Sequence, residues 1–188
     1  ETGAPLAGPY VLAKLREMDA ELNKAAPRVV RPRRESAEGG ARDDEAVHDL
    51  RVAIRRLRTL LKMSRELFGR WHTDVVRSAF RVVMQATGEL RDEEVLEETL
   101  EGAAKAEGFT EWLATRKTRE RKLRQNVIAR IERGDLERAR LMLKALLVFP
   151  VEPKRNIELS KFARKTVERA RRKVEDQRDV EVTDVVGM

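Results

Sequence analysis

Apolar residues recur along most of the chain at intervals of three and four positions, which is the period of an amphipathic α-helix. The pattern predicts helices over residues 9–27, 44–68, 71–90, 92–104, 109–133, 136–149 and 156–177. Alternating strand patterns of useful length are not found. The fold class is therefore predicted to be all-α.

Proline and glycine mark the expected helix ends. Pro27 is predicted to stop the first helix, and residues 27–41, with two prolines and a Gly-Gly pair, predict a surface loop. Gly69 is expected to form a left-handed C-cap after the second helix. A break at Gly88 is expected to interrupt or bend the third helical pattern, and residues 179–188 are left without an assigned element.

Several large apolar residues are expected to face the core. Trp112 is one of them on the 109–133 helix, and the last helix is expected to bury Phe162, Val167, Ala170 and Val174. Trp71 and His72, which follow Gly69, are assigned to packing at a helix start. These assignments predict that the last helix lies against the rest of the bundle.

The composition narrows the class of protein. Of 188 residues, 41% are hydrophobic but only 4% are aromatic, so the core must be mostly aliphatic, which favours helix over sheet. No cysteine is present, which excludes disulfides, thiolate metal sites and a cysteine nucleophile. No apolar run approaches the roughly 18 to 20 residues that cross a bilayer, so we expect a soluble protein. Residues 1–8 are expected to be a disordered lead, and the first three an expression remnant.

The charge balance points to an anionic partner. Charged residues make up 39% of the chain, and the formal net charge is +7. Arginine clearly outnumbers lysine. Such a surplus is typical of proteins that bind polyanions.

The helix over residues 44–68 carries two ordered stripes, one apolar and one cationic. At 100° per residue the cationic stripe covers an arc of about 80° beside the apolar one. It consists of His48, Arg51, Arg55, Arg58 and Lys62. Like charges at these spacings repel each other, so the stripe predicts an anionic ligand. Guanidinium groups suit phosphate because they donate two parallel hydrogen bonds and keep their charge.

Two further helices carry clustered cations. On the 109–133 helix the candidates are Arg116, Arg119 and Arg124, and on the last helix they are Lys161, Lys165, Arg169 and Arg172. The alternative interpretation is a set of solvated basic faces with acidic partners on adjoining helices. Three basic helices in one bundle favour ligand binding, and their convergence in space is a hypothesis.

Two segments resemble a known family. The run VHDLRVAIRRLR at residues 47–58 closely resembles the signature of the CHAD family, α-helical histidine domains that bind inorganic polyphosphate. The run GELRDEEVL at residues 88–96 resembles that family's Gly…Arg-Asp…Val segment. The resemblance implies two four-helix halves with a basic channel between or across them. It implies phosphate contacts by His48, Arg51, Arg55, Arg56, Arg58 and Lys62. Arg56 lies off the stripe and could instead bond a neighbouring helix.

The second half of such a fold is expected to be incomplete. In the family it carries its own His-x-x-Arg-x-x-x-Lys-x-x-Arg-Tyr stretch, which this sequence lacks. We therefore expect a bundle of long antiparallel helices: one four-helix half over residues 9–133, plus the start of a second half over residues 134–188. Arg91 and Asp92 are expected to form an ion pair at a helix junction.

The predicted function is non-enzymatic binding of inorganic polyphosphate in a basic groove, with no cofactor and no metal. Non-specific binding of RNA or duplex backbone is the main alternative, although neither a stacking platform nor a groove-entering motif is visible. A phosphohydrolase is disfavoured because no Gly-rich phosphate loop or His-Glu-x-x-His motif occurs, and the acidic stretch 89–98 is expected to be an exposed helix face. A helical adaptor for an acidic protein also stays open. The resemblance implies a cytoplasmic location, with polyphosphate granules as one option, and leaves the oligomeric state open.

Overall fold

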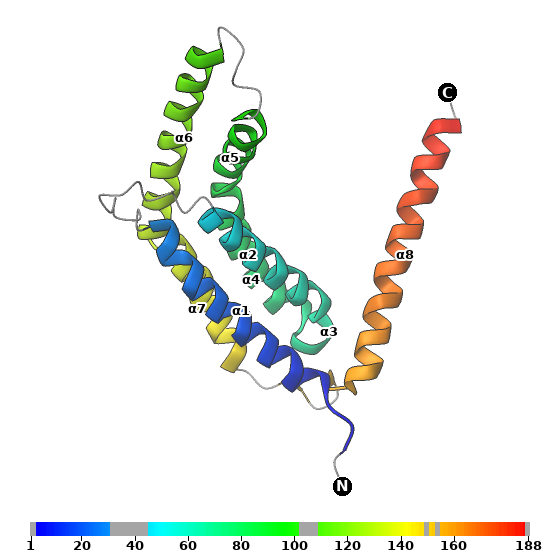
Figure 1. Ribbon diagram of the computed structural model, residues 1–188. Coiled ribbons are helices and arrows are strands. Elements are labelled where there is room, and N and C mark those ends of the chain that lie inside the picture. The colour runs from blue at the N-terminus through cyan, green and yellow to red at the C-terminus, as the bar shows by residue number, and fades with distance from the viewer. Residues whose placement is uncertain (1–2, 31–44, 102–108, 149–150, 153–154, 187–188) are drawn as a thin grey trace.

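The computed structural model describes residues 3–30, 45–101, 109–148, 151–152 and 155–186, and this part of the chain is almost entirely helical (Figure 1). The helices are Ala7–Val30 (α1), Glu45–Met63 (α2), Arg65–Phe68 (α3), Arg70–Ala86 (α4), Gly88–Glu101 (α5), Phe109–Glu132 (α6), Asp135–Val148 (α7) and Leu159–Val186 (α8). The only β-type pairing among the described residues is an isolated bridge between Leu6 and Glu158. The prediction of an all-α bundle is confirmed.

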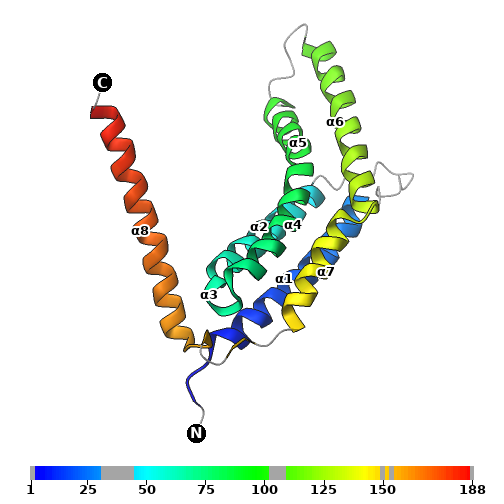
Figure 2. The ribbon, with the colours of Figure 1, turned by 180° about the vertical axis from the view of Figure 1, so that it is seen from behind.

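Helices α1, α2, α4 and α7 form a four-helix bundle around an aliphatic core. α2 packs between α1 and α4, and α7 packs on α4 and α1. The core joins all four helices and includes Leu15, Leu50, Leu57, Phe80 and Leu143. The α5–α6 hairpin continues from one end of this bundle, and α8 leaves from the other end (Figures 1 and 2). α7, which follows the boundary expected at residue 134, shares this core through Leu136, Ala139, Leu143 and Leu146.

The first helix runs through Pro27, contrary to the prediction that this residue stops it. A proline removes one amide donor from the helix. Buried Val29 and the ion pair of Arg28 with Asp49 of α2, at 2.5 Å, hold the turn beyond it against the bundle. Of the surface loop predicted over residues 27–41, residues 27–30 are helical instead, and residues 31–41 lie outside the described residues.

The second predicted helix is divided at Ser64. Its hydroxyl donates to the carbonyl oxygen of Leu60 at 2.8 Å, and the short α3 follows. Gly69 has the expected positive φ of 84°, but its ψ of 144° lies outside the left-handed helical well, so it forms an extended link to α4. The break predicted near Gly88 is confirmed, since α4 ends at Ala86 and α5 begins at Gly88.

Four predicted core residues are exposed instead. Trp112 is 39% exposed and lies against the guanidinium group of Arg116, 5.3 Å from the ring centre. Val167 and Val174 are exposed because α8 projects away from the bundle, and Ala170 is exposed with them. Only Phe162, near the start of α8, is buried as expected.

The helix-start assignment of the residues after Gly69 agrees with the contacts of His72. The His72 Nδ1 atom lies 3.1 Å from the carbonyl oxygen of Phe68, and its ring meets the Trp71 ring edge to face. Trp71 itself is 71% exposed, so it adds little packing. The tail from residue 179 to residue 186, left unassigned above, continues α8.

The base of α8 is tied to the start of α1. The Leu159 amide donates to the Pro5 carbonyl at 2.8 Å, and the Ala7 amide donates to the Ile157 carbonyl at 2.9 Å. The Gly8 amide, in the first turn of α1, donates to Oδ1 of Asn156 at 2.9 Å. Residues 5–8 therefore belong to the fold, and the expected lead of residues 1–8 is wrong for them.

Replacing Asn156 with alanine should destabilise the protein by about 1 kcal/mol, because a free amide at the start of α1 loses its acceptor. Gly8→Ala should act in the same direction, since its Cβ would lie 2.8 Å from Asn156 Oδ1. Urea unfolding followed by circular dichroism measures both effects. Asn126→Ala, at an exposed position on α6, is the control; an equal loss in that variant would contradict the capping role.

Candidate functional site

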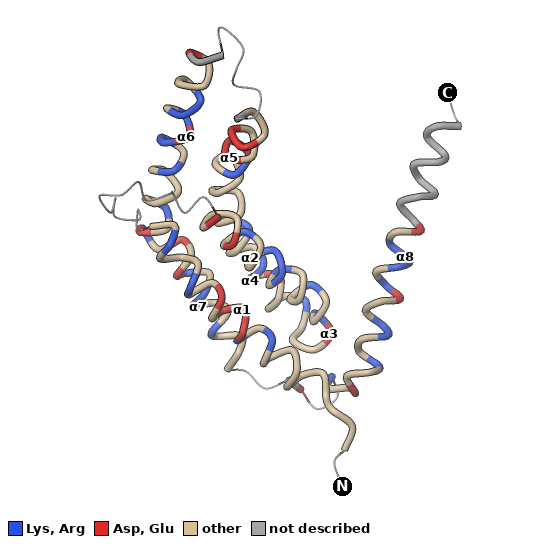
Figure 3. The backbone as a smooth tube through the Cα atoms, in the orientation of Figure 1, with Lys and Arg blue, Asp and Glu red and all other residues tan. Residues whose placement is uncertain are grey.

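The apolar stripe of α2 sets where its cations point. Leu50, Ile54, Leu57 and Leu61 are each fully buried, so the rotation of the helix about its axis is fixed by packing. The cationic stripe then runs along the side of α2 that meets α4 and faces α8. Figure 3 shows lysine and arginine positions along both α2 and α8.

Arg51 connects α2 to the junction of α4 and α5. One guanidinium nitrogen donates to the Met84 carbonyl and to the Thr87 hydroxyl, both at 2.9 Å. Burial lowers the pKa of Arg51, and neighbouring Arg55 and Arg91 act in the same direction, while Asp92 opposes them. Arg51 thus has a structural role that the sequence pattern did not indicate.

Arg58 lies in a cluster of cations. Burial lowers the pKa of this guanidinium, and Arg77 and Arg81 of α4 lower it further by repulsion. Its Nε atom is buried without a hydrogen-bond partner in the described part of the chain. Sequence reasoning missed Arg77 and Arg81, although their spacing of four residues places both on one face of α4.

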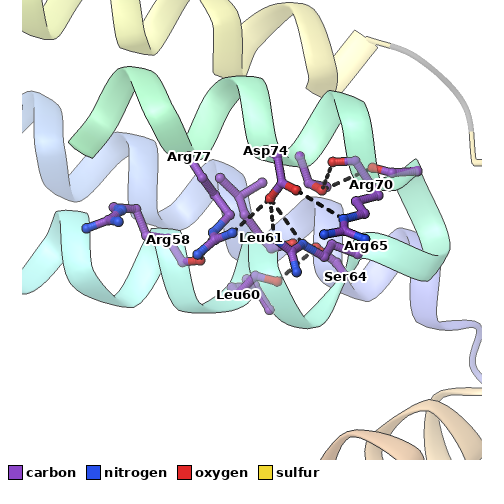
Figure 4. Close-up of polar contacts among 10 residues, drawn as sticks. Arg58, Leu60, Leu61, Ser64, Arg65, Arg70, Asp74 and Arg77 are labelled. Carbon is purple, nitrogen blue, oxygen red and sulfur yellow. Dashed lines mark hydrogen bonds and ion pairs between the residues drawn. The ribbon is translucent and has the colours of Figure 1, made fainter. Parts of the chain in front are cut away.

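Asp74 of α4 neutralises one end of this cluster (Figure 4). Its carboxylate accepts hydrogen bonds from Arg65 and, at 2.8 Å, from Arg77. Arg70 lies 3.7 Å away. The hydrogen bond from Arg65 is the main cause that holds the pKa of Asp74 below its usual value, with support from Arg77. In Figure 4 the Arg58 side chain points away from this carboxylate along α2.

A cleft of about 370 Å³ separates the C-terminal half of α2 from α8. We call it the α2–α8 cleft and define it by Thr59, Lys62 and Met63 of α2 and Thr166, Arg169, Ala170, Lys173 and Val174 of α8. Lys173 is the main cause that lowers the pKa of Lys62, and burial, Arg77 and Arg65 add to it. Two ammonium groups therefore face each other across the cleft.

The α8 cations predicted from sequence are only partly at this cleft. Arg169 lines it and donates to the carboxylate of Glu66, whose pKa falls mainly because of that hydrogen bond. Lys165 also lowers the pKa of Glu66. Lys161 and Arg172 are exposed on α8 and do not line the cleft. Lys173 was missed, although it continues the four-residue spacing of Lys161, Lys165 and Arg169.

The α6 cations face α5 instead of the cleft. Nε of Arg116 lies 2.8 Å from a carboxylate oxygen of Glu93, which is only 4% exposed, and Arg119 is 3.8 Å from its other oxygen. Arg124 joins Glu94 at 3.0 Å and Glu120 at 2.7 Å. The expected convergence of three basic helices is thus wrong for α6, and its three candidate residues have partners within the protein.

These contacts also correct the interpretation of the acidic stretch. Glu93 and Glu94 are buried between α5 and α6, not on an exposed face. Burial raises the pKa of Glu94, although Arg124 and Arg91 oppose that rise. The arginine at the helix junction pairs with Glu94 at 3.3 Å, not with the predicted Asp92.

The other stripe residues remain accessible to different degrees. His48 is half-buried near the start of α2. Arg55 and Arg56 are exposed. Arg55, Arg58 and Lys62, with Arg77, Arg81 and Lys173, thus form the group of cations that the fold gathers on one side of α2; we call it the cationic face.

The described residues contain no group of three or more histidine, aspartate or glutamate side chains that could hold a metal ion. Within the same ranges, no helix has the length and apolar character needed to span a membrane.

Comparison with known proteins gives one match. The family model described as the CHAD domain matches residues 13–184, which covers most of the chain and, in whole or in part, each helix from α1 to α8 of the described residues. No curated protein and no solved structure matches the chain.

Asp74→Asn should lower stability by about 1 kcal/mol at neutral pH, a value that allows for solvent screening of a partly exposed group. Because the pKa of Asp74 is held down in the folded state, its carboxylate stabilises the protein above about pH 4 and this contribution is lost as the pH falls below that value. Urea unfolding at neutral pH and near pH 3 should therefore show a difference between variant and wild type that shrinks in acid. Glu98→Gln, at an exposed position on α5, is the control. A difference that persists undiminished in acid would contradict the assignment.

Proposed function

The chain belongs to the CHAD family, and we propose that it binds inorganic polyphosphate, without catalysis, along the cationic face and the α2–α8 cleft. One observation carries this proposal: the fold places Arg58 and Lys62 near other cations, Arg77, Arg81 and Lys173. Burial and then repulsion by Arg77 and Arg81 lower the pKa of Arg58, and repulsion by Lys173 is the main cause that lowers the pKa of Lys62. A cluster of this kind destabilises the empty site and is relieved when phosphate oxygens lie between the positive groups.

The arrangement suits a linear polyanion better than a single small anion. The cations follow α2 over more than one helical turn and continue onto α4 and α8, so successive phosphates can each meet a guanidinium or ammonium group. Arginine contributes paired hydrogen bonds, and lysine contributes a mobile point charge. Binding of this type releases counterions and is therefore steeply salt-dependent.

No chemical step is part of the proposal. Retention of a phosphate chain by ion pairs and hydrogen bonds needs no nucleophile, general base or metal. Arg51 is left out of the ligand contacts because it donates hydrogen bonds to Met84 and Thr87. The α6 arginines are left out because they form ion pairs with Glu93, Glu94 and Glu120.

The lining of the cleft favours polyphosphate over single-stranded nucleic acid. Its walls combine cations with threonine, methionine, alanine and valine side chains, and no aromatic ring lines it within the described residues. Trp71 and Trp112 lie on α4 and α6, outside the cleft. Since bases are usually held by stacking on aromatic rings, phosphate recognition alone is the better fit.

Replacing Arg55 and Arg58 together with alanine should weaken polyphosphate binding by about tenfold or more, equivalent to roughly 1.4 kcal/mol. Titration calorimetry at two salt concentrations should also show a shallower salt dependence, because fewer counterions are released. The helical circular dichroism signal should stay unchanged, since neither side chain belongs to the core.

Lys24→Ala combined with Lys144→Ala is the matched control, because it removes the same charge from exposed positions on α1 and α7. If the control weakens binding as much as the Arg55/Arg58 variant does, binding depends on net charge alone and the proposed site is wrong.

Competition should separate the proposed ligand from the nucleic-acid alternative. We expect an RNA oligonucleotide of matched total charge to displace long-chain polyphosphate poorly at equal concentration and salt, because the cleft offers its bases no stacking surface. Fluorescence anisotropy of labelled polyphosphate measures the displacement. Equal displacement would instead support non-specific backbone binding.

A further inference from the structure

Helix α8 is the least supported element of the described fold. It contacts α1 at its base, where Phe162 is buried, and then runs beside the bundle without packing on it (Figures 1 and 2). Val167 is 67% exposed and Val174 is 56% exposed, so these apolar residues of α8 beyond Phe162 are not buried in the core. Beyond its base, α8 is linked to the bundle by polar groups at the α2–α8 cleft, such as Arg169, which donates to Glu66.

We propose that a phosphate group bridges Lys62 of α2 and Lys173 of α8 and draws α8 onto the bundle, so that bound ligand fixes the position of this helix. The inference rests on the proposed function and adds a conformational consequence to it. Any ligand whose phosphate oxygens can contact both lysines, such as polyphosphate or pyrophosphate, can form this bridge.

The two lysines are placed to repel each other when the cleft is empty. They belong to different helices, face each other across the cleft, and no acidic side chain lines it within the described ranges. The nearby Glu66 accepts a hydrogen bond from Arg169. One polar contact thus holds α8 toward α3 while the lysine pair pushes the next turn away.

The cleft also contains an unused hydrogen-bonding group. The Thr166 hydroxyl oxygen is buried and has no hydrogen-bond partner among the described residues. A buried hydroxyl without a partner is unfavourable, and phosphate oxygens are suitable acceptors for it. A ligand between Lys62 and Lys173 would lie in the same cleft as this hydroxyl, and the volume of about 370 Å³ has room for phosphate groups.

A bridging anion changes the sign of the interaction between the helices. Two attractive contacts replace one repulsion, so the ligand binds the closed arrangement more tightly than the open one and shifts the population toward it. By linkage, whatever holds α8 near α2 must also strengthen phosphate binding.

Because the chain contains no cysteine, two spin labels can be placed without background. Ser78→Cys on α4 and Val167→Cys on α8 are exposed positions that leave the formal charge unchanged. Double electron–electron resonance should give a broad distance distribution without ligand. Saturating polyphosphate, and pyrophosphate at higher concentration, should narrow it and shift it to shorter distances.

Two variants test the bridge itself. Lys173→Ala should abolish the narrowing, whereas Lys173→Glu should narrow the distribution without ligand, because its carboxylate pairs directly with Lys62. The Lys24/Lys144 double variant should respond as the wild type does.

The outcomes separate the two proposals. If calorimetry shows binding but the distance distribution does not change at saturation, the bridge is wrong and the proposed function stands. If polyphosphate does not bind at all, the proposed function fails. If the distance distribution of Lys173→Glu without ligand remains as broad as that of the wild type, the contact between residues 62 and 173 does not control the position of α8. The inference is then overturned.

Discussion

The arrangement of charges in this protein depends on the burial of one apolar stripe on α2. Leu50, Ile54, Leu57 and Leu61 fill the centre of the four-helix core, and they leave the helix no freedom to rotate. The adjacent cations are consequently held against α4 and toward α8, where they repel each other. Hydrophobic packing thus stabilises a cluster that electrostatics alone would disperse.

Two groups of cations in the described part of the chain have different physical roles. Those between α5 and α6 pair with buried carboxylates, and these ion pairs join the two helices in addition to apolar residues such as Leu90 and Val127. Those on the cationic face are arranged mostly among other cations, with Asp74 as a neutralising group at one end. The first group maintains the fold, and the second is the basis of the proposed ligand site.

Sequence patterns were reliable for helices whose apolar face is covered by neighbours, such as α2, α4 and α7. They were less reliable at Pro27, where burial of Val29 outweighs one lost hydrogen bond, and on α8, where apolar spacing predicted burial that no neighbouring helix supplies. Helical periodicity also placed Arg58 and Lys62 on one arc correctly. It could not show that Arg51 bonds the end of α4, or that Arg124 meets Glu94 across 30 residues of sequence.

The sequence by itself determined the all-α class, the family and the two stripes of α2, because these follow from spacing along one helix and from a local motif. Only the tertiary structure decided which cations have carboxylate partners and which face other cations. That distinction depends on contacts between helices that are distant in sequence, and helical periodicity contains no information about them. The α6 arginines have carboxylate partners, whereas Arg58, Lys62 and Lys173 lie near other cations, although all of these residues occur in similar basic helical patterns in the sequence.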